Sequence, residues 1–182
     1  MSVLALSGSS RADGETARLL NAVLTHLDDV ELFHLGDLRI GPYAYDHANA
    51  DDDFLALARR MLKASTIILA SPVYWYSMSA QMKAFFDRLS DLTDPPYKVL
   101  GKQLAGKTMF VVATGSAQTP PLSFAAPFED TAGYFNMRWG GLLYRPGRVA
   151  LTAEDIDAAR EFSELIAVSN GDIALKELLP SS

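Results

Sequence analysis

The 182-residue sequence predicts a doubly wound α/β domain built on a five-stranded parallel sheet. Short apolar runs rich in β-branched residues alternate with longer segments of helical periodicity, which is the pattern of successive βαβ units. The run 66–70 carries apolar residues at both parities, as expected of a strand buried on both faces of a parallel sheet. A chain of this length forms one hydrophobic core more readily than two.

The expected strands cover residues 3–7, 30–35, 66–70, 108–114 and 137–144. After a loop at 8–14, the first helix has an apolar stripe that begins at Ala17, and Asp13 is placed to cap it. The acidic run 51–53 suits the N-terminus of a second helix.

The helix that follows the third strand is expected to begin near Ser77 or Ser79. Its stripe at helical spacing contains Met78, Met82, Phe85, Phe86 and Leu89. A further helix is expected over 128–135, after a turn-rich segment, and Thr152 with Asp155 resembles a capping box that opens a last helix to about residue 168. Right-handed crossovers then bring the carboxyl ends of strands one, three and four to one crevice.

The loop after the first strand, residues 8–16 with sequence GSSRADGET, has the chemistry of a phosphate site. Free backbone N–H groups and the helix dipole favour an anion there. Ser9, Ser10 and Thr16 add hydroxyl donors, and Arg11 adds a guanidinium group whose charge-assisted hydrogen bonds are worth about 1.5–3 kcal/mol each. The spacing of Gly8 and Gly14 excludes both the nucleoside-triphosphate loop and the dinucleotide fingerprint.

The loops after the third and fourth strands predict a site for a planar ring. Three consecutive aromatic residues, Tyr74, Trp75 and Tyr76, follow a buried strand where loops are normally polar, and they offer stacking contacts. Small and hydroxylated residues in 114–119 permit close backbone approach from the other edge. An alternative is that the aromatic residues only seal the sheet or form a subunit contact.

Composition excludes several other functions. The net charge of −6 and the lack of clustered basic residues argue against nucleic-acid binding. No apolar stretch is long enough to span a membrane, and the start of the chain does not look like a targeting signal. The absence of cysteine excludes disulfides and thiolate metal sites, and three scattered histidines make another metal site unexpected. A cytoplasmic protein fits these properties best.

Two segments resemble the NAD(P)H-dependent FMN reductase family, which includes flavodoxin-like quinone, nitro, azo and flavin reductases. Residues 8–16 are similar to its FMN-phosphate loop, and residues 71–88, SPVYWYSMSAQMKAFFDR, are similar to its isoalloxazine loop and following helix. The resemblance implies a flavodoxin-like fold with strand order 2-1-3-4-5 and helices on both faces. It covers about residues 1–170, expected to form one FMN-binding domain, followed by a C-terminal tail at 171–182.

The resemblance also implies the residues of the site. Ser9, Arg11 and Thr16 would bind the FMN phosphate, and the ring would meet Pro72, Val73, Tyr74, Trp75, Gly115 and Ser116. Tyr74, Trp75 and Tyr76 would line the substrate face, and the segments 43–47 and 120–121 would form its walls. The flavin performs the chemistry, so no catalytic side chain is expected. Glu15 departs from the family pattern, and the lack of cysteine near 41–45 excludes an iron–sulfur branch.

The implied activity is hydride transfer from NAD(P)H through flavin N5 to a quinone, flavin or other small electron acceptor, in a homodimer. One alternative is a flavodoxin-type FMN electron carrier that serves protein partners. Another is a flavin-free regulatory domain of the same topology. The sequence favours no particular acceptor and does not separate NADH from NADPH.

Overall fold

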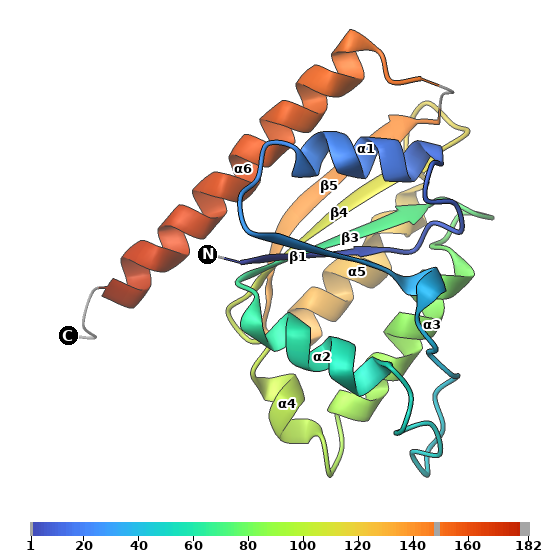
Figure 1. Cartoon of the computed structure of the whole chain (residues 1–182), viewed down its shortest axis with the longest axis vertical. Helices are drawn as coiled ribbons and strands as arrows, with labels where there is room; N and C mark the ends of the chain where they lie inside the picture. The colour runs from blue at the N-terminus through green and yellow to red at the C-terminus, as the bar shows by residue number, and fades with distance from the viewer. Residues whose placement is uncertain (1, 148–149, 179–182) are drawn as a thin grey trace.

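The computed structural model describes residues 2–147 and 150–178. Its centre is a parallel sheet of β1 (Val3–Ser7), β2 (Val30–His34), β3 (Thr66–Pro72), β4 (Thr108–Gly115) and β5 (Arg138–Pro146). The strands lie in the order β2-β1-β3-β4-β5, and every pairing is parallel. This arrangement confirms the predicted doubly wound, flavodoxin-like fold (Figure 1).

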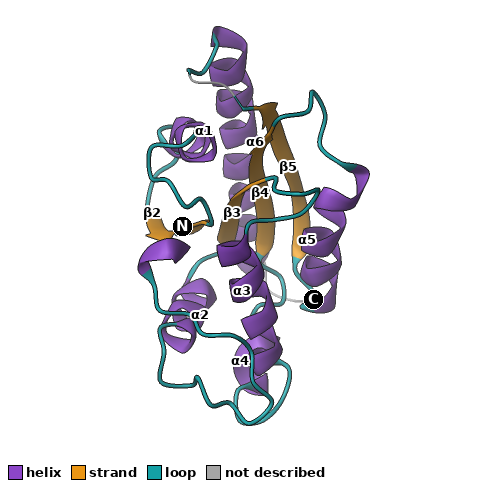
Figure 2. Ribbon diagram, turned by 90° about the vertical axis from the view of Figure 1, so that its right-hand side faces the viewer, coloured by secondary structure: helices purple, strands orange, loops and turns teal. Residues whose placement is uncertain are grey.

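Helices cover both faces of the sheet, so the molecule has three layers (Figure 2). The helices are α1 (Glu15–Leu24), α2 (Phe54–Lys63), α3 (Ala80–Arg88), α4 (Lys98–Lys102), α5 (Leu122–Tyr134) and α6 (Ala153–Leu178). Short 3-10 helices, η1 (Leu35–Asp37) and η2 (Leu89–Leu92), follow β2 and α3. Among the described residues, no helix is both long and apolar enough to cross a bilayer.

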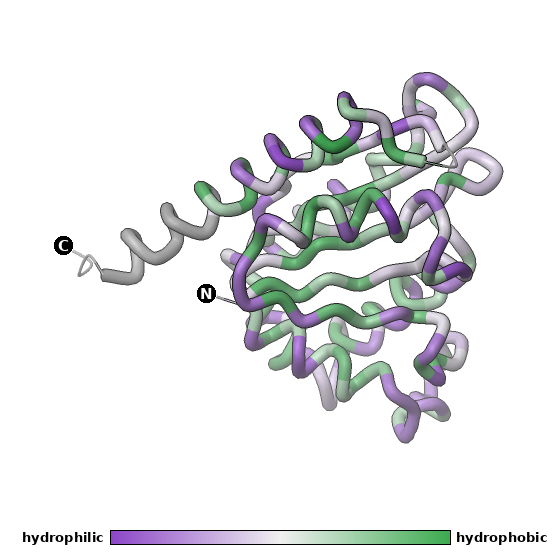
Figure 3. The backbone as a smooth tube through the Cα atoms, turned by 45° about the horizontal axis from the view of Figure 1, so that its top comes forward, coloured by the Kyte–Doolittle hydropathy of each residue, from purple (hydrophilic) through white to green (hydrophobic). Residues whose placement is uncertain are grey.

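Each face of the sheet has its own hydrophobic core. One core joins the sheet to α1 and α6 through residues such as Leu20 and Phe162. The other joins it to α2, α3 and α5 through residues such as Phe54, Phe85 and Phe128. In Figure 3 the central strands are mainly hydrophobic while the helices alternate in hydropathy, which is the pattern of a sheet buried between two amphipathic layers.

Two predicted helix starts are confirmed by their caps. The Ser79 Oγ accepts a hydrogen bond from the N–H of Met82 at 3.2 Å, so Ser79 is the N-cap of α3. At α6 the N–H of Thr152 donates to Asp155 Oδ2 at 2.9 Å, and the N–H of Asp155 donates to Thr152 Oγ1 at 3.2 Å. The expected capping box is therefore present.

Three helix boundaries differ from the sequence-based expectation. The N-cap of α1 is Gly14, which provides no side-chain cap, so the expected cap by Asp13 is wrong. Helix α5 begins at Leu122 instead of residue 128 and contains Pro127, a residue that normally indicates a helix boundary. Helix α6 continues to Leu178, beyond the expected end near residue 168.

A buried ion cluster centred on Arg88 holds the segment between η1 and α2 against α3. The Arg88 side chain is 1% exposed; it pairs with Asp52 and donates from Nε to Asp91 Oδ2 at 2.7 Å. It also donates to the backbone oxygens of Gly41 and Asn49, each at 3.2 Å. The remaining carboxylate oxygen of Asp91 contacts His47 Nδ1 at 2.8 Å. These bonds satisfy the guanidinium in a place where an unpaired charge would be costly.

Candidate cofactor site

The three loops predicted to form the site leave the same end of the sheet, at the carboxyl ends of β1, β3 and β4 (Figure 1). Strand register brings them level, because Ser7 pairs with Ala70 and Pro72 pairs with Thr114. The N–H of Gly8 donates to the Ala70 oxygen at 2.7 Å and fixes the start of the first loop beside β3. This edge is the general ligand position in doubly wound sheets.

The first loop ends at a helix N-terminus that no side chain caps. Gly14 occupies the N-cap position of α1 without a side-chain hydrogen bond, so the first-turn N–H groups have no intrahelical or capping acceptor. A Cβ at Gly14 would lie 3.3 Å from both the Cβ and the carbonyl oxygen of Arg11, so the loop turns back closely on itself there. Unsatisfied N–H groups together with the positive end of the helix dipole suit a phosphate.

Ser9 and Arg11 have different roles in this loop. The Ser9 hydroxyl donates to the Arg11 oxygen at 2.9 Å and accepts from the Arg11 N–H at 3.2 Å, so it orders the turn from within. The Arg11 guanidinium is solvent-exposed and pairs with the exposed Asp13, with 3.5 Å between Nε and Oδ1. Such surface pairs are worth about 0–1 kcal/mol, so this one does not prevent Arg11 from turning to an anion.

Thr16 connects the first loop to the third. Its Oγ1 lies 2.6 Å from Oγ1 of Thr114, near the end of β4, and both side chains are buried. The predicted phosphate loop and the loop after β4 are thus in direct contact through two hydroxyl groups.

The aromatic residues of the second loop form a tight turn. The N–H of Tyr74 donates to the Ser77 oxygen at 2.9 Å, and the Ser77 N–H donates to the Tyr74 oxygen at 3.0 Å. The central residues Trp75 and Tyr76 have φ angles of +49° and +68°, the left-handed region that glycine or asparagine normally occupies in such turns. Two bulky residues in this region each cost about 1–3 kcal/mol, and such strain is characteristic of functional sites.

A cavity of about 300 Å³ lies between the second and third loops. Its lining residues are Val73, Trp75, Tyr76, Gly115, Ser116, Ala117, Pro121 and Tyr144. Most of the residues predicted to contact the ring or the substrate line it, whereas Pro72 is buried in β3 and Tyr74 lies outside the lining. The expected wall at 43–47 does not line this cavity; within that segment His47 bonds to Asp91, which lies in η2.

Tyr144 is a cavity residue that the sequence did not indicate. Its Oη donates to the Ala117 oxygen at 2.7 Å and so holds the third loop to β5. Burial raises the pKa of Tyr144, so the phenol stays protonated and remains a donor at neutral pH. Tyr144 pairs with Ala113, near the end of β4 from which the third loop leaves. Its place beside the cavity therefore becomes apparent only once the register of β5 against β4 is known.

The residues of the three loops fit both the phosphate and the ring of FMN. A Cβ at Gly115 would lie 2.9 Å from Tyr144 Oη and 3.1 Å from Val73 Cβ, so only glycine leaves the cavity open at that point. The uncapped α1 N-terminus, the Arg11 guanidinium and the hydroxyl groups form a suitable donor set for a phosphate. A ligand with a phosphate at one end and a planar ring at the other matches both parts.

We expect Tyr144→Phe to weaken FMN binding by about 2- to 10-fold, because one net hydrogen bond of about 0.5–1.5 kcal/mol holds the loop beside the ring. The measurement is a titration of the apo-protein that follows quenching of flavin fluorescence. Tyr134→Phe is the matched control, because Tyr134 is exposed on α5 and lies outside the cavity. An equal loss in both variants would show that the Ala117 bond has no role in binding.

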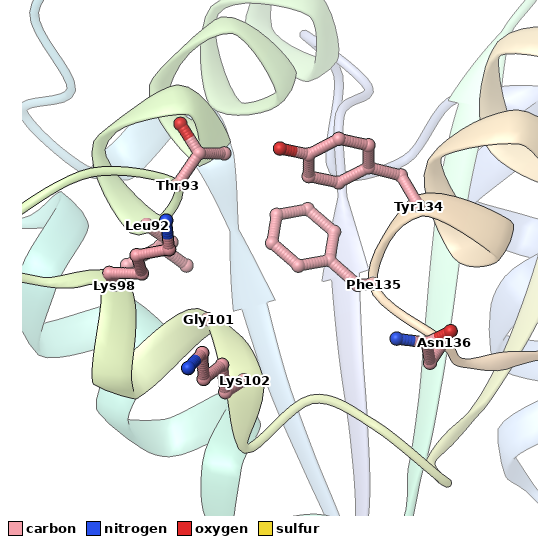
Figure 4. A pocket seen from close by; sticks show the side chains of 8 residues that line it. All are labelled: Leu92, Thr93, Lys98, Gly101, Lys102, Tyr134, Phe135 and Asn136. Carbon is pink, nitrogen blue, oxygen red and sulfur yellow. The ribbon is translucent and has the colours of Figure 1, made fainter.

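A smaller recess of about 190 Å³ lies at the other end of the sheet, between α4 and the end of α5. In Figure 4 the rings of Tyr134, the last residue of α5, and of Phe135, which follows it, project toward Thr93. Its residues precede β4 and β5, and none of the predicted site residues lines it. This recess is therefore separate from the candidate cofactor site.

The fold and site together define a protein of the flavin-dependent reductase class. The model of the family described as NADPH-dependent FMN reductase matches residues 1–137. The chain belongs to this family, which confirms the predicted relationship, an NAD(P)H-dependent oxidoreductase activity, FMN as cofactor and NAD(P)H as co-substrate.

A curated relative agrees with this assignment, and a solved structure shares the fold. The chain is 27% identical over 172 residues to a Bacillus subtilis protein provisionally named the NAD(P)H-dependent FMN-containing oxidoreductase YwqN, covering 87% of this chain and 94% of that protein. It is 28% identical over 189 residues to an iron-sulfur flavoprotein of Archaeoglobus fulgidus, covering 92% and 79%. The solved Trp repressor binding protein from Bacillus subtilis has the same fold, with a TM-score of 0.72, 23% identity and coverage of 88% and 97%.

The similarity to an iron-sulfur flavoprotein does not extend to its cluster. This chain contains no cysteine, so it has no thiolate ligands for iron. The flavin site is the part that the two proteins can share.

Proposed function

We propose that the protein transfers hydride from NAD(P)H through flavin N5 to a small electron acceptor such as a quinone or a flavin. The cavity of about 300 Å³ between the aromatic turn and the third loop is the observation that carries this proposal. When bound, FMN supplies the redox chemistry, and the protein's part is to bind, orient and shield it.

We assign the phosphate end to the first loop and the ring end to the other two. Arg11, the first-turn N–H groups of α1 and the Thr16 hydroxyl would bind the phosphate. Ser9 would stabilise the loop through its hydrogen bonds to the Arg11 backbone. Val73, Gly115 and Ser116 would lie along the ring, while Pro72 fixes the end of β3 beneath the second loop and Tyr74 closes the turn.

The aromatic turn would form the substrate face. Trp75 is 92% exposed, and Tyr74 and Tyr76 are also largely exposed, so flat apolar surface is available beside the cavity. Large exposed aromatic side chains of this kind favour planar ligands that stack. Both the nicotinamide of NAD(P)H and a quinone have this shape, so the two substrates would use the same face in turn.

Further properties of the protein remain predictions. We propose that residues 1–170 form the FMN-binding domain, although α6 continues through 171–178, so that the expected C-terminal tail begins within a helix. A homodimer and a cytoplasmic location also remain predictions.

The purified protein tests the proposal directly. We expect visible flavin absorption that NADH or NADPH bleaches without air, and sustained oxidation of the same nucleotide when a quinone is added. Negligible turnover with normal flavin absorption would support a flavodoxin-type electron carrier instead. A colourless protein that takes up no added FMN would contradict the proposed function and favour a flavin-free domain.

A further inference from the structure

Two buried threonines join the first loop, at the start of α1, to β4, an interior strand of the sheet. Thr16 is 2% exposed and lies in the first turn of α1, and Thr114 is 5% exposed and lies near the end of β4. Their Oγ1 atoms are 2.6 Å apart, although the residues are separated by 98 positions in the sequence. No other side-chain hydrogen bond involving either hydroxyl is present in the described part of the chain.

The direction of this hydrogen bond decides what Thr16 can offer a ligand. A hydroxyl has one proton and two acceptor lone pairs, so one of the two threonines donates and the other keeps a free proton. Thr114 lies in β4, a strand with neighbours on both sides, whereas Thr16 lies in the first turn of α1, two residues after the N-cap Gly14. If Thr114 donates, the free proton belongs to the residue at the helix N-terminus.

We propose that Thr114 is a positioning residue for the FMN phosphate. Its hydroxyl donates to Thr16 Oγ1 and thereby directs the Thr16 proton outward to the phosphate, which accepts it. A donor that is itself an acceptor of a hydrogen bond is polarised and becomes stronger. This inference rests on the proposed binding of the phosphate in the first loop, and it adds a residue of β4 that does not itself contact the phosphate.

A purely structural role for the pair makes a different prediction. The bond also fastens α1 to β4, and loss of that attachment would loosen the whole end of the sheet where the ring binds. Affinity for any flavin would then fall to the same extent. A positioning role affects only flavins that carry the phosphate, so the ratio of FMN to riboflavin affinity separates the two roles.

The test compares the wild-type protein with Thr114→Val, Thr114→Ala and Thr114→Ser. Apo-protein is titrated with FMN and with riboflavin, and flavin fluorescence reports binding. We expect the valine and alanine variants to bind FMN about 3- to 10-fold more weakly, with riboflavin affinity unchanged, and the serine variant to retain wild-type affinity. The phosphorus resonance of bound FMN should shift in the valine and alanine variants only.

Ser163→Ala is the matched control, because the buried Ser163 hydroxyl donates within the α1–α6 layer, away from the loop, and its loss should leave both affinities unchanged. Equal weakening of FMN and riboflavin in the Thr114 variants, or no weakening of FMN, would overturn the positioning role. If either substitution prevents folding, the other and the serine variant give the same comparison. Wild-type protein that binds riboflavin as tightly as FMN would instead contradict the proposed phosphate site itself.

Discussion

Replacing Arg88 by methionine is expected to lower the free energy of unfolding by about 3–5 kcal/mol. Methionine preserves most of the side-chain volume but removes the charge, which leaves the carboxylates of Asp52 and Asp91 buried without their cation. It also leaves the oxygens of Gly41 and Asn49 without a donor. Breaking a buried pair in this way costs far more than the net value of the pair, because the remaining charges stay desolvated.

The size of this loss should depend on pH. Burial raises the pKa of Asp52, but hydrogen bonds from Arg88 and from the N–H groups of Phe54 and Gly41 outweigh it, and the pKa lies below its usual range. In the wild type this carboxylate therefore stabilises the fold above the unfolded pKa of about 3.9, and the contribution is lost as pH falls through the lower folded value. Without Arg88 one of the groups that lower this pKa is lost and the folded pKa rises, so the variant loses less stability on acidification than the wild type does.

Urea unfolding at pH 7 and pH 4 measures both effects. The difference between the wild type and Arg88→Met should be largest at pH 7 and smaller at pH 4. Arg59→Met, an exposed substitution on α2 with the same change of charge, should alter stability by less than about 0.5 kcal/mol. A loss below about 1 kcal/mol for Arg88→Met would show that the cluster contributes little to the fold. A large loss that does not change with pH would show that the Asp52 charge is not its source.

The cluster also illustrates which parts of the structure the sequence could predict. Strands and helix faces follow local patterns, and Ser79 and the Thr152–Asp155 box were recognisable because a cap depends on residues three positions apart. Arg88 contacts Asp52 across 36 positions and Gly41 across 47, and no local pattern encodes such distances. The early start of α5 was missed because Pro127 indicates a boundary, although the helix continues through it.

The sequence predicted which loops form the candidate site, but not the contacts and backbone conformations within them. The aromatic residues were found because such side chains are unusual after a buried strand, and Gly115 because a small residue there permits close backbone approach and the family resemblance includes it; the cavity joins them. The left-handed conformation of Trp75 and Tyr76 was not predictable, because neither residue favours it. The contacts of Tyr144 with the third loop and of Thr114 with Thr16 depend on strand register and burial, which are known only once the strands are paired.

Replacing Arg11 by methionine is expected to weaken FMN binding by about 10- to 150-fold, which corresponds to one charge-assisted bond of about 1.5–3 kcal/mol. Arg11 is 65% exposed and pairs only with exposed Asp13 among the described ion pairs, so reorientation to a phosphate dianion replaces a weak partner with a stronger one. Riboflavin lacks the phosphate, and its affinity should not change.

Salt provides an independent measure of the same charge. Binding of FMN to the wild type should weaken as ionic strength rises, and the dependence should be smaller in Arg11→Met because one cation is absent. Arg59→Met again serves as the control, since its charge lies on α2 and outside the loop, and it should leave the FMN dissociation constant within about twofold of the wild type. If Arg11→Met also stays within that range, the phosphate is held by the α1 N–H groups and hydroxyls alone, and Arg11 remains with Asp13 when FMN binds.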